Sequence, residues 1–406
     1  MKKALTGMMV CILLAALAAP ALGAGGTVPT DGKPVADGIN EFALDLYGRL
    51  SPKKGNLFFS PYGISTALTM TYAGARGETA RQMRDVLAFR IGDDRLHAGC
   101  ANLSASLEAD PKTAGYELTI ANALWGQRGY GFQSAFLALN RKHYGAGLKS
   151  VDFVRNAEGA RKEINGWVEK KTRDRIKDLI PAGVLSPLTR LVLTNAIYFK
   201  GDWAAKFKES RTKDGIFQVS AAEKVTVPMM KQTEKFGYHQ GRGFQALELP
   251  YKGDALSMVM FLPESIDGLA GLEKVLTAKK IAEVTARLRR QKVRLEMPRF
   301  KMTLFVSLKD ALVAMGMADA FSDRRADFSG MTGRRDLYIS AVLHKAFVEV
   351  NEEGTEAAAA TAVVMALRGM PAPPPLFRAD RPFVFIIRDR GTGAILFMGR
   401  VANPKA

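Results

Sequence analysis

Residues 352–371 read EEGTEAAAATAVVMALRGMP, and this stretch decides how the rest of the chain is interpreted. Residues 357–367 carry no charge and lead into Arg368. A cluster of prolines follows at Pro371, Pro373, Pro374 and Pro375. Propensity alone favours an alanine-rich helix capped by Thr355. That helix would have only a weak apolar stripe, and it would run from a strand at 342–352 into prolines that cannot continue it.

The same stretch has the composition of a segment that can slide between two strands of a sheet. Such a segment needs small residues where it passes and uncharged residues where it becomes buried. Glu356 falls on the face that water can solvate, and the opposite face holds Thr355, Ala357, Ala359, Thr361, Val363 and Met365. Fourteen extended residues at about 3.3 Å each span roughly 46 Å. Full insertion would therefore carry Arg368, and anything bonded to it, a whole sheet length.

The remainder of the 406-residue chain predicts one large α+β domain. It is 47% hydrophobic and 24% charged, and no linker or repeat divides it after about residue 38. Apolar periodicity predicts helices at 39–50, 64–73 and about 157–180. Strands are predicted at 116–125, 191–199, 245–250, 256–262, 292–304, 341–352, 382–388 and 394–400. Helical patterns mostly precede strands instead of alternating with them, which favours the α+β class.

The N-terminus has the pattern of a signal peptide. Lys2 and Lys3 precede an apolar stretch at 8–19, and small residues follow up to Gly23. We therefore expect residues 1–23 to be removed and the protein to be secreted, into the extracellular space or a periplasm. Cys100 is then the one cysteine left, so the mature chain can form no internal disulfide.

Residues 352–371 resemble the hinge and reactive loop of inhibitory serpins, and further motifs similar to that family occur in the family's order. They are Asn56–Pro61, Asn195–Trp203, Leu249–Tyr251, Met297–Phe300, Ala326–Thr332, His344–Ala346, Phe377–Ile387, Phe397–Val401 and Asn403-Pro404. The resemblance covers the chain from about Ile39 onward. It implies a single serpin domain at 24–406, with a large central sheet, two further sheets, surrounding helices and an exposed reactive-centre loop at about 353–376.

The resemblance also implies which bond is the bait. In inhibitory serpins the scissile bond lies fourteen residues beyond the hinge glycine, which here is Gly354, so the cut falls between Arg368 and Gly369. A shift of one residue would make Leu367 or Gly369 the bait instead. Arginine fits a pocket that holds a carboxylate, so the expected partner is a trypsin-like serine protease bound as a covalent acyl complex, and an Arg-specific cysteine protease would also accept it. The implied hinge is Gly354, Thr355, Glu356, Ala357, Ala358, Ala359, Ala360 and Thr361.

Other functional positions are implied in the body of the domain. By resemblance, Ser60, Asn195 and His344 form a shutter beneath the sheet that opens. Trp203, Glu352 and Arg299 would lie at the breach, where the loop enters. The residues alone predict that His344 is a buried, hydrogen-bonded histidine. Gly63 departs from the family pattern, since many serpins have a second serine there, and it puts the usual network in doubt.

The chain has a formal net charge of +18, and one basic run stands out. It consists of Lys279, Lys280, Arg287, Arg289, Arg290, Lys292 and Arg294. The run either binds heparin-like polyanions or is simply a solvated face. We expect no cofactor, no metal and no membrane partner, and a monomer.

Two other classes of function compete with the inhibitor. An enzyme is disfavoured because the chain has no HExxH, GxSxG, phosphate-cradling Gly-Lys loop or paired cysteine ligands, and no catalytic residue is assigned. A non-inhibitory serpin, acting as a carrier or chaperone, is the other alternative. Such members usually have bulky or charged hinge residues, whereas 357–360 are four alanines.

Overall fold

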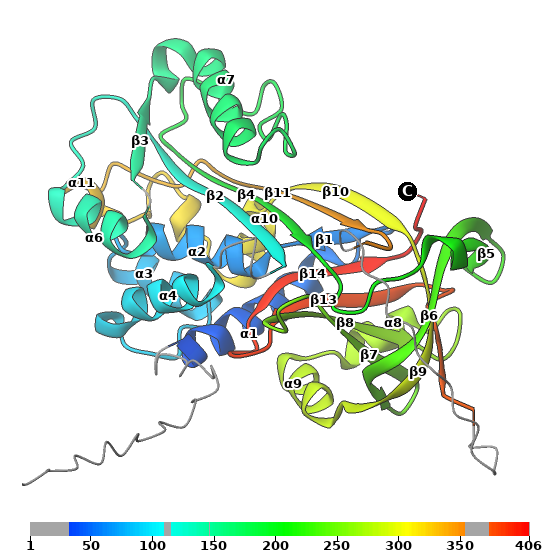
Figure 1. Ribbon diagram of the computed structural model, residues 1–406. Coiled ribbons are helices and arrows are strands. Elements are labelled where there is room, and N and C mark those ends of the chain that lie inside the picture. The colour runs from blue at the N-terminus through cyan, green and yellow to red at the C-terminus, as the bar shows by residue number, and fades with distance from the viewer. Residues whose placement is uncertain (1–31, 109–114, 146, 354–372, 406) are drawn as a thin grey trace, which may run out of the picture.

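The computed structural model describes residues 32–108, 115–145, 147–353 and 373–405 (Figure 1). The predicted signal peptide, the predicted hinge from Gly354 and the predicted bait Arg368 with Gly369 lie outside these residues. Within the described part of the chain, no helix combines the length and the apolar character needed to cross a bilayer.

Five strands form a mixed sheet in the order β10–β11–β4–β2–β3. They are β2 (Tyr116–Gln127), β3 (Leu148–Val151), β4 (Leu191–Gly201), β10 (Phe300–Ser307) and β11 (Ala341–Val350). In its middle, β4 and β11 are parallel neighbours that pair from Ala341 opposite Val192 to Phe347 opposite Tyr198. Both strands continue beyond this last pair, so the parallel ladder ends before the strands do.

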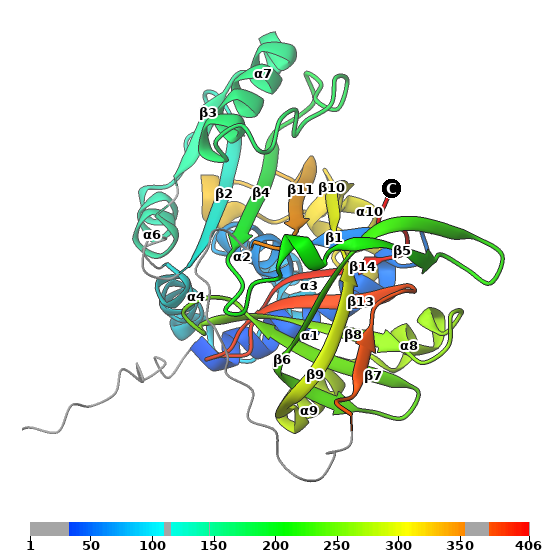
Figure 2. The same ribbon diagram turned by 45° about the vertical axis from the view of Figure 1, so that its right-hand side comes forward.

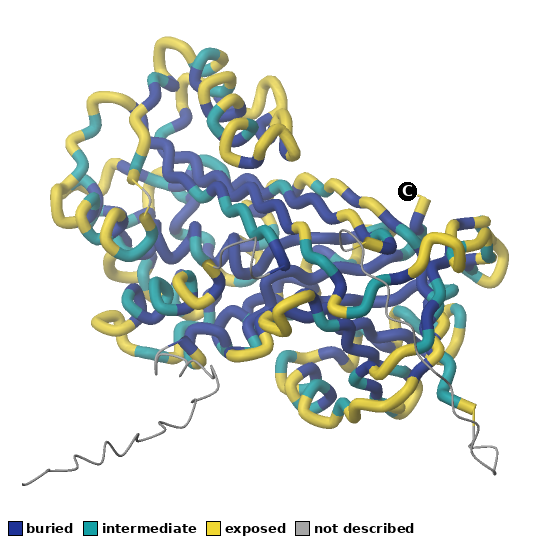
Figure 3. Tube along the Cα trace, in the orientation of Figure 1, coloured by how far each residue is buried: buried dark blue, intermediate teal, exposed yellow. Residues whose placement is uncertain are grey.

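The five-stranded sheet has a core on each face, which explains why β4 is buried along its first nine residues. Alternate residues of β4 point to opposite sides, with Leu193 and Ile197 in one apolar cluster and Val192 and Ala196 in the other. Figures 1 and 2 show α7 (Phe153–Lys171) on one side of the sheet and α2 (Pro61–Tyr72) on the other. Buried backbone follows the strands between these layers (Figure 3).

The remaining strands form a nine-stranded sheet in the order β1–β14–β13–β8–β7–β6–β9–β12, with β5 paired to β6. Its members are β1 (Leu57–Phe59), β5 (Lys213–Gln218), β6 (Lys224–Gln240), β7 (Phe244–Pro250), β8 (Leu256–Pro263), β9 (Arg289–Pro298), β12 (Leu376–Arg378), β13 (Phe383–Asp389) and β14 (Ile395–Val401). The 17 residues of β6 pair with β9, β5 and β7. The two further sheets that were expected are therefore joined into one sheet, because the single strand β6 pairs with β5, β9 and β7 along its length.

The other helices pack against one another and against the sheets. They are α1 (Gly32–Leu50), α3 (Gly77–Val86), α4 (Asp93–Leu107), α6 (Ser134–Tyr144), α8 (Leu269–Val275), α9 (Ala278–Arg287), α10 (Lys309–Met315) and α11 (Ser329–Thr332), with short 3-10 turns η1 (Glu209–Arg211) and η2 (Asp319–Phe321). The helices expected at 39–50 and 64–73 are confirmed as α1 and α2, and the fold class is confirmed as α+β.

Two element predictions were wrong in their bounds. The helix expected at about 157–180 ends at Lys171, because Arg173 and Asp174 take positive φ angles of 49° and 59°. Ile176 and Ile180 are buried without helical structure, so their apolar spacing was mistaken for a longer helix. The strand expected at 292–304 is two strands in different sheets, β9 and β10, and the chain changes sheet at Arg299.

Candidate functional site

A row of three polar side chains crosses the middle of the five-stranded sheet. His344 of β11 lies opposite Asn195 of β4, and Asn195 lies opposite Asn122 of β2. His344 Nδ1 is 2.5 Å from Asn195 Oδ1, and Asn195 Nδ2 donates to Asn122 Oδ1. We call His344, Asn195 and Asn122 the polar row. It joins β11 to β4, the two strands that a sliding segment would have to separate.

The polar row is tied to the start of α2. The backbone N–H of Ser60 donates to His344 Nε2 at 3.1 Å. Since an N–H cannot accept, Nε2 carries no proton and Nδ1 is the nitrogen that donates to Asn195. The Ser60 hydroxyl donates to the carbonyl of Leu396 at 2.6 Å and accepts from the N–H of Gly63 at 3.0 Å, which caps α2.

His344 is neutral at physiological pH. Its side chain is fully buried, and that burial lowers its pKa to about 3 because the charged imidazolium would lose its hydration. One ring nitrogen donates and the other accepts, so the neutral ring is fully satisfied. The prediction of a buried, hydrogen-bonded histidine is confirmed.

Gly63 is the departure from the family pattern, and the structure gives a physical reason for it. A Cβ at this position would lie 2.5 Å from Asn195 Nδ2, so a side chain there would displace the polar row. Asn122 Nδ2 also donates to the Gly63 carbonyl at 3.4 Å. The network that Gly63 put in doubt is therefore closed by Asn122, which sequence reasoning missed because its position opposite Asn195 depends on strand register.

A second cluster lies past the end of the parallel ladder, at Glu352. This residue is 2% exposed, and its Oε2 lies 2.5 Å from Arg299 Nε, while Thr212 donates to Oε1. Burial alone would raise the pKa of Glu352, but the hydrogen bonds from Arg299 and Thr212 outweigh it and lower the pKa below its usual value. The carboxylate is therefore charged and paired at the last residues before the undescribed segment.

Trp203 holds the backbone beside Glu352. Its indole Nε1 donates to the carbonyl of Asn351 at 3.0 Å, and its ring stacks on Tyr251 with centroids 4.6 Å apart. The carbonyl of Glu352 also accepts from the N–H of Phe207 at 3.1 Å. The structure thus brings Trp203, Glu352 and Arg299 together and adds Tyr251, which sequence analysis named only as part of a family motif, and Thr212, which it did not single out.

The basic run is divided between a helix and a strand. Lys279, Lys280 and Arg287 lie on α9, whereas the other four lie on β9. Arg290, Lys292 and Arg294 are two residues apart in β9, so they share one face of the strand, and all three are exposed. Arg289 lies opposite Tyr238, which is buried on the other face, so Arg289 belongs to that other face.

This arrangement allows one specific rearrangement of the sheet. β4 and β11 are parallel, so a segment that left the end of β11 and turned back between them would run antiparallel to both. It could then exchange backbone hydrogen bonds with each neighbour. Beneath the new strand would lie the polar row, and the contacts of Glu352 and Trp203 would mark its point of insertion.

Comparisons with known proteins agree on one family. The family model described as "Serpin (serine protease inhibitor)" matches residues 37–404. The chain is 45% identical over 378 residues to the leukocyte elastase inhibitor of Xenopus tropicalis, covering 91% of this chain and 99% of that protein. It is 44% identical over 378 residues to an uncharacterised serpin-like protein of Thermococcus kodakarensis, covering 92% of this chain and 86% of that one. The crystal structure of uncleaved ovalbumin matches with a TM-score of 0.83 at 30% identity, over 91% of this chain and all of that chain.

Proposed function

Because this chain belongs to the serpin family of protease inhibitors, and so is not itself an enzyme, we propose that it is an inhibitory member acting on trypsin-like serine proteases. In this proposal the protease cleaves the bond between Arg368 and Gly369, and the segment from Gly354 onward inserts between β4 and β11. The acyl-enzyme is carried along and distorted before it can hydrolyse. Loop insertion of this kind adds a strand to an existing sheet and releases strain stored in the uncut chain.

The observation that carries the proposal is the parallel pairing of β4 with β11. The alanine-rich hinge follows β11 after only three further residues, so insertion needs no other part of the chain to move between sheets. The buried polar row of His344, Asn195 and Asn122 contributes the side-chain hydrogen bond between β11 and β4, the two strands that have to separate. A carrier or chaperone would have no need of a hinge made of residues that fit inside a sheet.

Arg368 supports the target class. Its guanidinium suits a primary pocket that holds a carboxylate, whereas elastase has a small pocket. The named leukocyte elastase inhibitors among the relatives therefore share the family with this chain, and the proposed target differs from theirs. The N-terminal pattern of Lys2, Lys3 and the apolar stretch at 8–19 supports export, so we propose a target outside the cytoplasm.

The decisive experiment mixes the purified protein with trypsin and looks for a complex that survives boiling in SDS. Wild type should form this complex, and Arg368→Glu should form none, because the pocket carboxylate repels the new side chain. Thr355→Arg should still be cleaved but should release active trypsin, since insertion buries position 355 and a buried unpaired charge is costly. A Thr355→Arg protein that traps trypsin as well as wild type would contradict the insertion mechanism.

A further inference from the structure

Like charges face each other on an exposed surface of the nine-stranded sheet. Lys235 of β6 lies directly opposite Lys292 of β9, and Arg290 and Arg294 alternate onto the same face as Lys292. All four side chains are exposed. Like charges placed opposite one another in a sheet destabilise it. We call Lys235, Arg290, Lys292 and Arg294 the cation row.

The acidic residues nearby do not neutralise the cation row. Glu296 shares its face, but Arg378 of β12 binds that carboxylate at 2.8 Å and Lys231 of β6 lies 3.5 Å from it. Glu234 is adjacent to Lys235 in sequence but lies opposite Val293, whose side chain is buried. Glu234 therefore belongs to the face of β6 that does not carry the cation row. Among the described residues, the four cations of the row make no ion pair.

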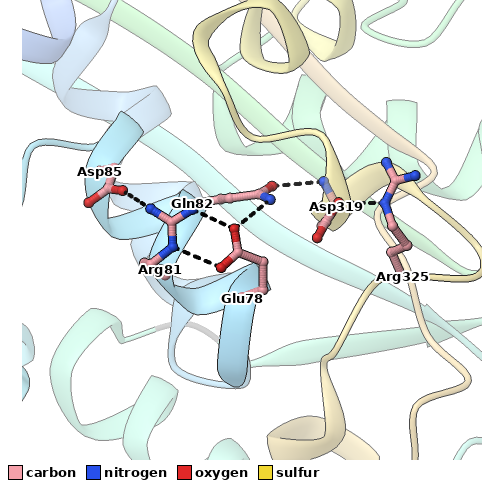
Figure 4. A network of polar contacts seen from close by, with 6 residues as sticks. All are labelled: Glu78, Arg81, Gln82, Asp85, Asp319 and Arg325. Atoms are coloured by element: carbon pink, nitrogen blue, oxygen red, sulfur yellow. Dashed lines mark hydrogen bonds and ion pairs between the residues drawn. The ribbon is translucent and has the colours of Figure 1, made fainter.

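Some arginines elsewhere on the surface are matched by acids. Figure 4 shows such a network, in which Arg81 of α3 bonds to Glu78 and Asp85, and Arg325 bonds to Asp319. What distinguishes the cation row is the strand register, which places Lys235 directly opposite Lys292 with no acidic partner for either among the described residues.

The cation row adjoins the place where the chain resumes after the bait. The backbone N–H of Arg294 donates to the Pro375 carbonyl at 2.9 Å, and Leu376 of β12 lies opposite Arg294 in the parallel pair β12·β9. Pro375 follows Arg368 by seven positions, so even a fully extended chain of about 3.3 Å per residue spans at most about 23 Å between them. A protease domain of about 230 residues is roughly 45 Å across. Its rim therefore comes close to the cation row when its pocket holds Arg368.

We propose that the cation row is a secondary docking surface for the target protease, and that this protease carries acidic side chains beside its active-site cleft. The inference rests on the proposed function. It makes the surface charge of the protease a second determinant of which protease is inhibited, beside the fit of Arg368 in the protease pocket. Complementary charge acts mainly by steering the encounter, so the cation row raises the association rate more than it stabilises the final complex.

A polyanion is the competing occupant, and the geometry favours the protease. Lys280 and Arg287 of α9 line one pocket with His239, which shares the face of Lys235 on β6, so a polyanion would extend from the cation row onto α9. Lys280 already lies 3.7 Å from Glu283. The cation row runs across β6 and β9 to Arg294, which lies opposite Leu376 of β12. Figure 2 shows β6 and β9 side by side in the lower part of the molecule.

The test compares anionic and cationic trypsin, which share the pocket chemistry but differ in surface charge. The variant Lys235→Gln/Lys292→Gln/Arg294→Gln should form the SDS-stable complex with both enzymes. At low salt its association rate with anionic trypsin should fall by about tenfold, and this difference should shrink at high salt. Its rate with cationic trypsin should not fall. Its melting temperature should be no lower than that of wild type, since a like-charge pair has been removed.

The matched control is Lys162→Gln/Lys170→Gln/Lys309→Gln, which removes three exposed cations elsewhere and changes the net charge equally. If the control slows anionic trypsin as much as the cation-row variant does, net charge explains the effect and the inference is wrong. Equal rates for wild type and the cation-row variant, with acceleration by heparin only in wild type, would instead assign the surface to a polyanion and overturn the inference. Absence of an SDS-stable complex with both trypsins would overturn the proposed function itself.

Discussion

At the scale of single residues, the polar row depends on one missing side chain. Gly63 leaves room for the Asn195 amide, which reaches Asn122 on one side and His344 on the other. A partly satisfied buried network is worse than none, because each unpaired polar group keeps its full desolvation cost. The hydrogen bonds of the polar row therefore hold β4 and β11 together, and a small change of a side chain beside Asn195 is enough to break them.

Gly63→Ala tests this dependence. The new methyl would meet Asn195 Nδ2 at 2.5 Å, so we expect the free energy of unfolding to fall by about 1–3 kcal/mol. Gly48→Ala is the matched control, since nothing lies within 4 Å of its Cβ in helix α1 and the exchange should stabilise by about 0.5–1 kcal/mol. Urea unfolding of both variants measures the difference, and equal stability of Gly63→Ala and wild type would show that the row tolerates a side chain.

His344 predicts a dependence of stability on pH. An unfolded histidine titrates near 6.5, whereas burial lowers the pKa of His344 to about 3 in the folded state. Between these values the unfolded chain binds a proton that the folded chain refuses, so stability from this residue is complete above pH 6.5 and is lost as pH falls. The loss approaches about 1.4 kcal/mol per pH unit. Urea unfolding between pH 7.5 and 5.5 should show this slope, and His344→Asn should reduce it.

At the scale of elements, the function proposed here needs β4 and β11 to separate. Their ladder stops at Tyr198 and Phe347, before either strand ends, and Trp203 and Glu352 fix the backbone at that end. The sheet is thus most easily opened from the end at which the hinge leaves β11.

A disulfide across β4 and β11 should convert the inhibitor into a substrate. Ala196 and Lys345 are direct partners in the parallel pair, at a separation suited to a disulfide. Oxidised Ala196→Cys/Lys345→Cys should be cleaved after Arg368 without trapping trypsin, and reduction should restore the SDS-stable complex. Burial raises the pKa of Cys100 to about 12, so this thiol should not compete. Lys345→Cys alone is the control, and trapping by the oxidised double variant would contradict strand separation.

At the scale of the whole molecule, the proposal requires that the uncut chain is not at its lowest free energy. A dozen new ladder hydrogen bonds at about 1 kcal/mol each, with burial of Val363 and Met365, would release on the order of 10–15 kcal/mol. That is comparable with the entire stability of an ordinary domain. Only a change in the topology of the sheet can release so much free energy.

Cleavage after Arg368 should therefore stabilise the protein. We expect the nicked form to melt roughly 15–30 °C above the intact form, because the freed hinge segment becomes a new strand. Differential scanning calorimetry of both forms measures this shift. Nicked Thr355→Arg should show little of it, and identical melting temperatures for intact and nicked wild type would rule out stored energy.

Sequence alone determined the family, the α+β class and the buried strand at 191–199, because alternation, composition and motif order are local properties. It also pointed to His344, Asn195 and Ser60 by resemblance, and the structure places them in contact. Tertiary structure alone decided that Asn122 closes the polar row, that Thr212 joins Glu352, and that Lys235 opposes Lys292. Each of these depends on which residues of distant strands lie opposite one another, and register is set by packing across the sheet, which no single segment encodes.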